Sequence, residues 1–223
     1  MQAVGQPGRI VEPYLPLLVA PFIGLLLGRV VVAAAPATAC AEASQSRLRV
    51  GMAAGAVAIA LGAVLTTPDI FLAWANSFLG WGLLALAWID GRHLRLPDAL
   101  TLPLLLLGLG AAWLLEPWLL TDRATGAIFG YVAFRLIGWG YAAWRGRDGL
   151  GQGDAKLLAA GGAWVGAEDL SWVVMLAAMA GICWFGLRSM QGVPVTARSR
   201  VPFGPFLALA IWTVRMAQVF GSG

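Results

Sequence analysis

The sequence predicts an all-α integral membrane protein, a polytopic bundle of about eight transmembrane helices with both termini on the outer side. Of its 223 residues, 60% are apolar and only 12% are charged, against roughly 25% charged residues in soluble domains. The mean hydropathy is +0.79. So few charges could not cover the surface of a soluble domain of this size. The composition also excludes a disordered chain, a disulfide-stapled secreted domain and a coiled coil.

Eight apolar segments are candidates for membrane spans, because a transmembrane helix needs about 20 mostly apolar residues. The sixth segment is short for a span. The first has Ala-x-Ala spacings like those of a signal peptide, but Arg9 and Glu12 make its flank a poor positive n-region, so we expect it to stay as a helix. The segments lie near residues 14–35, 49–66, 70–90, 98–115, 124–144, 155–166, 169–187 and 203–220.

Basic residues concentrate in alternate loops between these segments. If the N-terminus faces outward, the outer loops hold mostly acids, and Arg123 is their one basic residue. The positive-inside rule therefore predicts an outward N-terminus. The same alternation requires the short sixth segment to span, which places the C-terminus outward as well. The inner basic residues are Arg47, Arg49, Arg92, Arg95, Arg145, Arg147, Lys156, Arg188, Arg198 and Arg200.

The net charge of +4 is explained by these loop arginines, and the chain has no basic stripe with interleaved aromatic residues. We therefore expect no nucleic-acid partner. Cys40 and Cys183 are far apart and form no Cys-x-x-Cys pair, so they predict neither a zinc site nor a disulfide framework. The single histidine, His93, argues against a zinc hydrolase and against a Ser-His-Asp or Cys-His catalytic arrangement. We expect no metal and no cofactor.

Three aspartates near predicted helix ends are the candidates for chemistry. An aspartate at the centre of a membrane helix costs about 2.5–3.5 kcal/mol, so an acid kept near the membrane suggests a function. Asp90 closes its segment, where the helix dipole disfavours a negative charge. Asp98 and Asp154 each precede an apolar run, so a capping role stays open for both. We expect all three at the cytoplasmic ends of their helices.

A pair of these aspartates suits acid–base catalysis. Two carboxyl groups brought close together cannot both ionise, so one keeps its proton and the other acts as a general base on water, as in aspartic proteases. Gly151 and Gly153 precede Asp154 and allow the backbone to bend sharply there. Lys156 follows it and is the only lysine in the chain. Lysine and arginine differ as donors, so a special role for Lys156 and chance stay equally open.

Four stretches of the chain, in their order and at their spacings, resemble the motifs of a known family. "GQGDAK" resembles the GxGDxK motif of type IV prepilin peptidases, which belong to the GxGD class of intramembrane aspartic proteases. "WIDGRHLRLPDALTLPLLLLGL" resembles the stretch around that family's first catalytic aspartate, and "VPFGPFLALA" resembles the segment before its last helix. "APFIGLLLGRVVVAAAP" loosely resembles its first helix, with Arg29 where the family often has Asn. The resemblance covers nearly the whole chain as one membrane-embedded peptidase domain, residues 1–223.

The resemblance implies a role for each site residue. Asp90 and Asp154 would be the catalytic pair, and Gly151 and Gly153 would shape the active-site loop. Asp98 would be an accompanying structural acid. Lys156 matches the lysine of the motif, and we expect it to hold a negative charge on Asp154.

The resemblance also implies an activity. It predicts a multi-pass protein of the bacterial inner membrane that cuts the short basic leader from prepilins or type II secretion pseudopilins at the cytoplasmic face. Its partners would be those N-terminal segments and the lipid bilayer. Two alternatives stay open: a proton- or cation-coupled transporter using Asp90 and Asp154, and a non-catalytic pilus or secretion assembly subunit. Acids in the middle of a span and facing a pore, rather than acids at the membrane rim, would favour the transporter. An assembly subunit would not need both aspartates, so replacing either by asparagine should leave its function intact.

One departure from the family concerns the loop at residues 36–48. Many bacterial members carry two Cys-x-x-Cys pairs there, which bind zinc and accompany N-methyltransferase activity. Here the predicted cytoplasmic loop is short and Cys40 is its sole cysteine. The sequence therefore argues against a zinc subdomain and against methyltransferase activity.

Overall fold

The computed structural model describes residues 14–33, 42–67, 69–145, 151–191 and 202–221. Their regular structure is entirely helical, and no strand occurs within these ranges, which confirms the all-α prediction for this part of the chain. In chain order the helices are α1 (Leu15–Ala33), α2 (Glu42–Thr66), α3 (Ile70–His93), α4 (Asp98–Leu115), the 3-10 helix η3 (Pro117–Leu119), α5 (Leu120–Arg145), α6 (Gln152–Met190) and α7 (Gly204–Gly221).

Four of the described helices are long and apolar enough to cross a membrane. They are α3, α4, α6 and the part of α2 from Arg49 to Thr66. The apolar stretch of α1, Leu15–Arg29, is shorter. These helices fit an all-α membrane protein. The count of eight spans and the outward position of both termini stay predictions.

Two predicted boundaries differ from the structure. Helix α2 begins at Glu42, so residues 42–48 of the predicted loop 36–48 are helical. Polar residues fill that first part of α2, and hydropathy therefore missed it. Residues 34–41 with Cys40, and the inner arginines Arg147, Arg198 and Arg200, lie outside the described residues. The predicted sixth and seventh segments form one element, α6.

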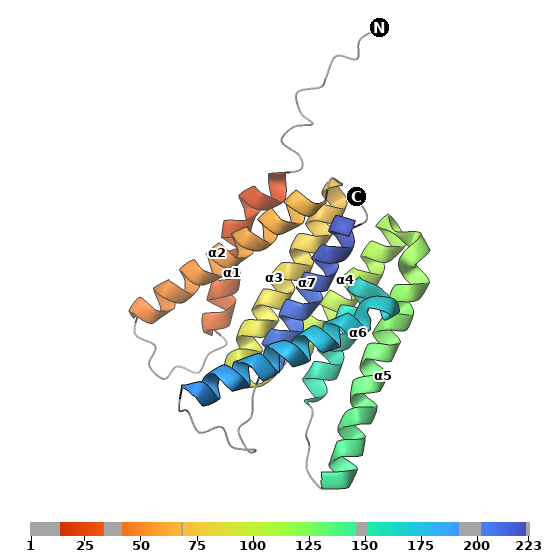
Figure 1. The fold of residues 1–223 in the computed structure, drawn as a ribbon. Helices are drawn as coiled ribbons and strands as arrows, with labels where there is room; N and C mark the ends of the chain where they lie inside the picture. The colour runs from red at the N-terminus through yellow and green to blue at the C-terminus, as the bar shows by residue number, and fades with distance from the viewer. Residues whose placement is uncertain (1–13, 34–41, 68, 146–150, 192–201, 222–223) are drawn as a thin grey trace. The chain divides into compact units, whose positions relative to one another are not determined.

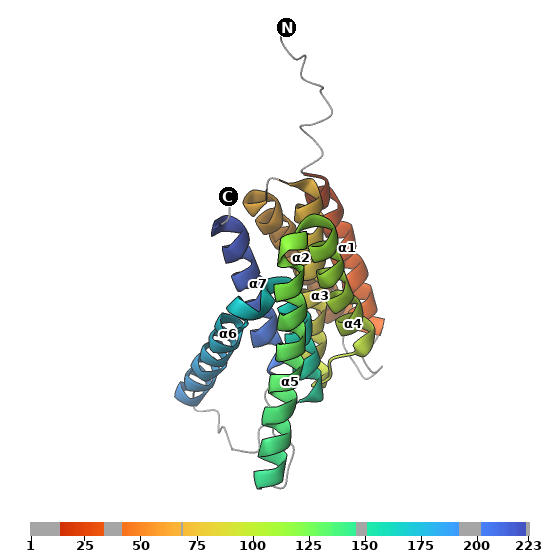
Figure 2. The same cartoon turned by 90° about the vertical axis from the view of Figure 1, so that its right-hand side faces the viewer.

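Helix α6 is interrupted at Gly166, the last residue of the predicted sixth segment. Its φ of 87° and ψ of 175° are not helical, and only glycine adopts this conformation without strain. The two helical stretches on either side meet at an angle (Figure 1, Figure 2). Beyond the interruption, Asp122 of α5 accepts a hydrogen bond from the Ala167 N–H at 3.0 Å. This carboxylate satisfies a backbone donor that the broken helix leaves free.

The chain forms two compact units, of which the first comprises residues 1–81 and 219–223. Helices α1 and α2 pack against each other in it (Figure 1). A Cβ built on Gly24 of α1 would lie 2.5 Å from the Ala53 Cα of α2, so only glycine permits this approach. The core holds small buried side chains, and the Trp81 Nε1 donates to the Ala56 carbonyl at 3.0 Å. Small residues allow membrane helices to pack closely.

The second unit comprises residues 82–218. Its most extensive helix contact joins α5 and α6, where a Cβ on Gly126 would lie 2.8 Å from the Gly162 carbonyl oxygen. The Trp164 side chain of α6 donates to the Leu104 carbonyl of α4 at 2.8 Å. This unit contains every candidate site residue that the sequence predicts.

Candidate active site

Asp90 lies in the last turn of α3 and is buried, with 5% of its surface exposed. Its Oδ2 accepts a hydrogen bond of 2.9 Å from the backbone N–H of Gly204. Gly204 is the first residue of α7 and lies 114 positions further along the chain. The contact therefore joins the C-terminal end of one helix to the N-terminal end of another.

Asp154 lies in the first turn of α6 and is partly buried. Its carboxylate accepts a hydrogen bond from the backbone N–H of Gly151, and its charge interacts unfavourably with that of Asp90. The structure thus brings the two aspartates close enough for their charges to repel, although they are 64 positions apart. The N-cap position of α6 belongs to Gly151 and not to Asp154.

The glycines before Asp154 are needed for space and not for an unusual backbone. Gly151 has φ −65° and ψ 135°, values that any residue adopts. A Cβ on Gly151 would lie 2.9 Å from the Asp154 Oδ2, and one on Gly153 would lie 2.9 Å from the Leu96 Cβ. The expected sharp bend is therefore replaced by close packing of the start of α6 against Asp154 and against the linker before α4.

Lys156 pairs with Asp98 and not with Asp154, which corrects the partner expected from the resemblance. The Lys156 Nζ lies 2.6 Å from the Asp98 Oδ1 and 2.7 Å from Oδ2. Asp98 is the first residue of α4, whose N-cap position belongs to Pro97. The two side chains are 32% and 55% exposed. They connect the starts of α4 and α6 beside the aspartate pair.

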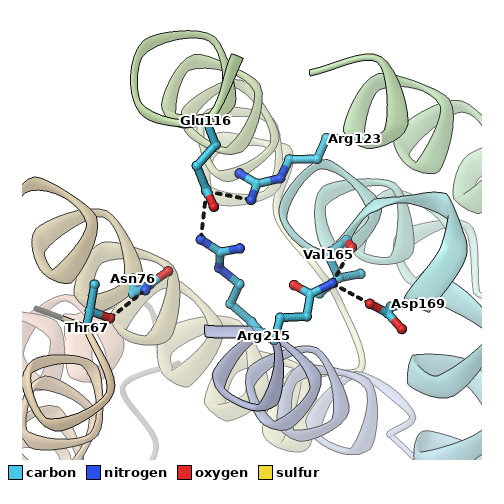
Figure 3. A network of polar contacts seen from close by, with 8 residues as sticks. Thr67, Asn76, Glu116, Arg123, Val165, Asp169 and Arg215 are labelled. Atoms are coloured by element: carbon cyan, nitrogen blue, oxygen red, sulfur yellow. Dashed lines mark hydrogen bonds and ion pairs between the residues drawn. The ribbon is translucent and has the colours of Figure 1, made fainter. Parts of the chain in front are cut away.

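A second polar cluster joins Glu116, the residue after α4, to α5 and α7 (Figure 3). The Glu116 Oε2 lies 2.6 Å from Arg123 Nη2 and 3.0 Å from Arg215 Nη2. Both arginine side chains are 2% exposed. Burial alone would raise the pKa of Glu116, but the charges and hydrogen bonds of Arg215 and Arg123 outweigh it and lower the pKa below its usual value. Glu116 is therefore held as a carboxylate between two cations.

The last turns of α7 also contact the interruption in α6. The side-chain amide nitrogen of Gln218 donates to the Val165 carbonyl at 2.6 Å and to Asp169 at 2.7 Å (Figure 3). The Val165 carbonyl lies just before Gly166, where the helix can no longer supply a partner. Helix α7 is thus fixed to Asp90 at one end and to Glu116 and α6 at the other.

Sequence reasoning missed two features of this unit. It quoted the Pro-Phe-Gly-Pro segment but gave Gly204 no role, although a glycine and proline at a helix start were a visible signal. It also passed over Arg215, which is a charged residue inside an apolar segment. Because burying a charge is costly, such a residue is expected to pair with an oppositely charged group. Neither the contact with Asp90 nor the contact with Glu116 can be found without knowing how α7 packs.

The arrangement supplies two carboxyl groups whose charges interact, and each accepts a hydrogen bond from a backbone N–H. Such a pair can share one proton and exchange it with a bound water. Among the residues that the structure describes, no three His, Cys, Asp or Glu side chains lie close enough together to hold a metal ion.

Comparisons with known proteins agree on one family. Residues 77–186 match the model of the type IV leader peptidase family, a range that includes Asp90, Asp98 and Asp154. A prepilin leader peptidase/N-methyltransferase of Pseudomonas aeruginosa is 41% identical over 145 residues, covering 63% of this chain and 48% of that protein. One of Dichelobacter nodosus is 40% identical over 147 residues, covering 63% and 49%.

The chain therefore spans about half the length of these two relatives. It spans more of the leader peptidase HopD of Escherichia coli, which is 44% identical over 127 residues, 56% of this chain and 81% of that protein. No solved structure matches the chain significantly. The matched range includes both aspartates, and the chain is 44% identical to HopD over a stretch that covers 81% of that protein. The chain therefore belongs to the type IV leader peptidase family.

Proposed function

We propose that the chain is a prepilin leader peptidase, an aspartic endopeptidase of the bacterial inner membrane. The observation that carries the proposal is that Asp90, at the end of α3, and Asp154, at the start of α6, lie near enough for their charges to interact. Family membership supports the same reading, because the curated relatives are named for leader cleavage. Acids at helix ends beside closely packed glycines favour hydrolysis over ion transport.

The proposed reaction needs only the two carboxyl groups and a water. The ionised carboxylate takes a proton from the water while the oxygen of that water attacks the scissile carbonyl carbon. The protonated carboxyl group gives its proton to the carbonyl oxygen. The tetrahedral intermediate then breaks its C–N bond, and the amine leaves with the proton that the first group had taken. The second group recovers its proton from the collapsing hydroxyl, which restores the starting pair.

The proposed substrates are the N-terminal segments of prepilins or type II secretion pseudopilins. Their short basic leader would be removed at the cytoplasmic face, where the positive-inside rule puts Arg92 and Arg95 beside the site. Anionic lipid headgroups would concentrate a basic leader at this surface. We further propose that both compact units act as one membrane-embedded peptidase domain.

We do not propose the second activity that some relatives' names carry. The Pseudomonas and Dichelobacter proteins are named as N-methyltransferases too, whereas HopD is named only as a leader peptidase. The two cysteines of this chain form no Cys-x-x-Cys pair. A cleaved pilin from the experiment below should therefore lack the mass of an added methyl group on its new N-terminal residue.

The function is tested by expressing the chain with a panel of prepilins and pseudopilins in a host that lacks its own leader peptidase. Leader removal is measured by gel shift and by N-terminal sequencing. Wild type is compared with Asp90→Asn and Asp154→Asn, and Glu168→Gln is the matched control because Glu168 is an exposed acid outside the site. Each variant is checked for accumulation in the membrane.

Cleavage by wild type and Glu168→Gln, lost in both aspartate variants, is the expected result. Cleavage that survives in Asp154→Asn would show that the pair is not the catalytic machinery. If wild type cleaves no member of the panel while a related leader peptidase cleaves them in parallel, the proposed activity is wrong. Proton or cation uptake abolished by the same variants would then favour a transporter.

A further inference from the structure

The position of Asp90 is unfavourable for a carboxylate in two ways. It lies in the last turn of α3, where the aligned backbone dipoles place partial negative charge. It is also buried, with 5% of its surface exposed, so water does little to stabilise its charge. A carboxylate kept there needs a compensating group from elsewhere in the fold.

Helix α7 supplies that group from its first residue. The Gly204 N–H donates to the Asp90 Oδ2 at 2.9 Å, within the range of a good hydrogen bond to an ionised acceptor. The N–H groups of a first helical turn have no partner inside their own helix and carry the positive end of its dipole. The partial positive charge at the start of α7 therefore offsets the partial negative charge that the end of α3 places beside Asp90.

The contact also explains why this position is glycine. A Cβ built on Gly204 would lie 2.6 Å from the Asp90 Oδ2, 2.8 Å from Cγ and 3.0 Å from Cβ. Real Cβ atoms essentially never approach other atoms more closely than 3.0 Å. Among the described glycines, Gly166 alone has a positive φ, so Gly204 is required for space and not for its backbone conformation. Any other residue would push the Asp90 carboxylate away from the amide.

We infer that Gly204 is a positioning residue of the aspartate pair: its N–H holds one oxygen of Asp90, and its missing side chain makes room for that carboxyl group. Held in this way, Asp90 keeps its other oxygen for water and for the proton that it shares with Asp154. The inference rests on the proposed function and extends the site from α3 and α6 to α7.

The test compares three glycine-to-alanine variants of the full chain in detergent micelles. Gly204→Ala introduces the clash with Asp90. Gly108→Ala is the matched crowding control, because its Cβ would lie 2.7 Å from the Trp164 Nε1 where α4 meets α6. Gly110→Ala is the neutral control, since nothing lies within 4 Å of its Cβ. Measurements are kcat and KM on a prepilin peptide, normalised to folded protein, and Tm.

Gly204→Ala should lower kcat about 10- to 100-fold with KM little changed, the range expected for a lost hydrogen bond to a charged group. Gly108→Ala should lower Tm and the amount of folded protein but leave kcat per folded molecule near that of wild type. A wild-type kcat in Gly204→Ala, or an equal loss of kcat in Gly108→Ala, would overturn the inference.

A spectroscopic readout separates this inference from the proposed function. The side-chain carboxyl of 13C-labelled Asp90, assigned by its absence in Asp90→Asn, should move in Gly204→Ala and stay in place in Gly108→Ala. This signal needs no substrate, so it tests Gly204 even if the chain cleaves no leader. An unmoved Asp90 signal together with normal leader cleavage would reject the role of Gly204 and leave the peptidase standing.

If Gly204→Ala fails to accumulate, the double variant Asp90→Ala/Gly204→Ala decides the question. Removing the Asp90 carboxyl removes the two shortest of the three close contacts. Recovered accumulation would place the damage at Asp90 as inferred. Continued failure would show that the Gly204 side chain is excluded by something else.

Discussion

Lys156 contacts Asp98 through both carboxylate oxygens, at 2.6 and 2.7 Å, although 58 positions separate the two residues. Lys156 lies two residues after Asp154 on α6, and Asp98 begins α4. Exposed ion pairs contribute little to stability, usually below about 1 kcal/mol. The pair therefore matters more for where the start of α6 lies than for how stably the chain folds.

Exchanging the two charges tests this contact. We expect Lys156→Asp to lower leader cleavage about threefold or more, because like charges would then face each other at the start of α6. Asp98→Lys should do the same through two facing cations. The double variant Asp98→Lys/Lys156→Asp restores opposite charges and should recover most of the cleavage rate. The measurement is the initial rate of cleavage at equal amounts of enzyme.

Salt supplies the control for that exchange. The losses in the single variants should shrink as ionic strength rises, because exposed charges are screened. A double variant as defective as the single ones would show that Lys156 acts by another route, such as contact with substrate.

The cluster of Glu116, Arg123 and Arg215 predicts a dependence of stability on pH. Burial raises the pKa of Glu116, but the two arginines lower it further, so the net pKa lies below the usual value. A depressed pKa stabilises the fold at pH values above the unfolded pKa of about 4.3, and the gain is lost as pH falls through the lower folded pKa. We therefore expect the Tm of the wild type to drop as the pH falls below about 4.3.

Replacing Glu116 by glutamine should remove this contribution to the dependence of stability on pH. Glu116→Gln leaves two buried arginines without their shared anion, and breaking a buried pair in this way costs about 3–5 kcal/mol at neutral pH. The difference in Tm between wild type and Glu116→Gln should narrow as pH falls below about 4. Glu168→Gln, an exposed glutamate with the same change, should behave as wild type throughout. A constant difference at every pH would contradict the assignment to Glu116.

Local signals in the sequence identified the helices and the two aspartates. Hydropathy located the apolar segments because burial in lipid acts on each segment by itself. It missed residues 42–48 of α2 because they are polar. Asp90 and Asp154 could be singled out because an acid near the membrane is costly wherever the rest of the chain packs.

Contacts between distant segments could not be predicted in the same way. The partner of Lys156 depends on how α4 and α6 pack, and the donor to Asp90 depends on where α7 begins. Sequence reasoning assigned Lys156 to the nearer aspartate, Asp154, because the two share a motif. The structure gives it the more distant Asp98, which no spacing within the motif indicates.

The interruption of α6 predicts a site where alanine is poorly tolerated. Gly166 has φ 87°, and the Asp122 carboxylate occupies the place that a Cβ would take. Gly166→Ala should therefore lower Tm in detergent and reduce accumulation, because both the backbone conformation and the space exclude a side chain. Gly186→Ala lies in the same element with open space around it and should be neutral or slightly stabilising. Equal behaviour of the two variants would contradict the role of Gly166.

The last prediction concerns which side of the membrane each end of α4 faces. Arg92 and Arg95 precede α4, and Glu116 follows it, so the positive-inside rule puts its start in the cytoplasm. Single cysteines at Ala99 and Trp118, both exposed, probe the two ends after Cys40 and Cys183 are changed to serine. An impermeant maleimide added to intact spheroplasts should label Trp118→Cys at once and Ala99→Cys only after the membrane is opened.

The labelling result constrains the proposed reaction as well as the topology. Asp98, the residue before Ala99, pairs with Lys156, which follows Asp154 on α6. The end of α4 that Ala99 marks is therefore the end beside the aspartate pair. Labelling of both cysteines from outside would mean that α4 does not span. Labelling of Ala99→Cys alone would put the aspartates on the outer face, where a leader held in the cytoplasm could not reach them, and cleavage at the cytoplasmic side would be excluded.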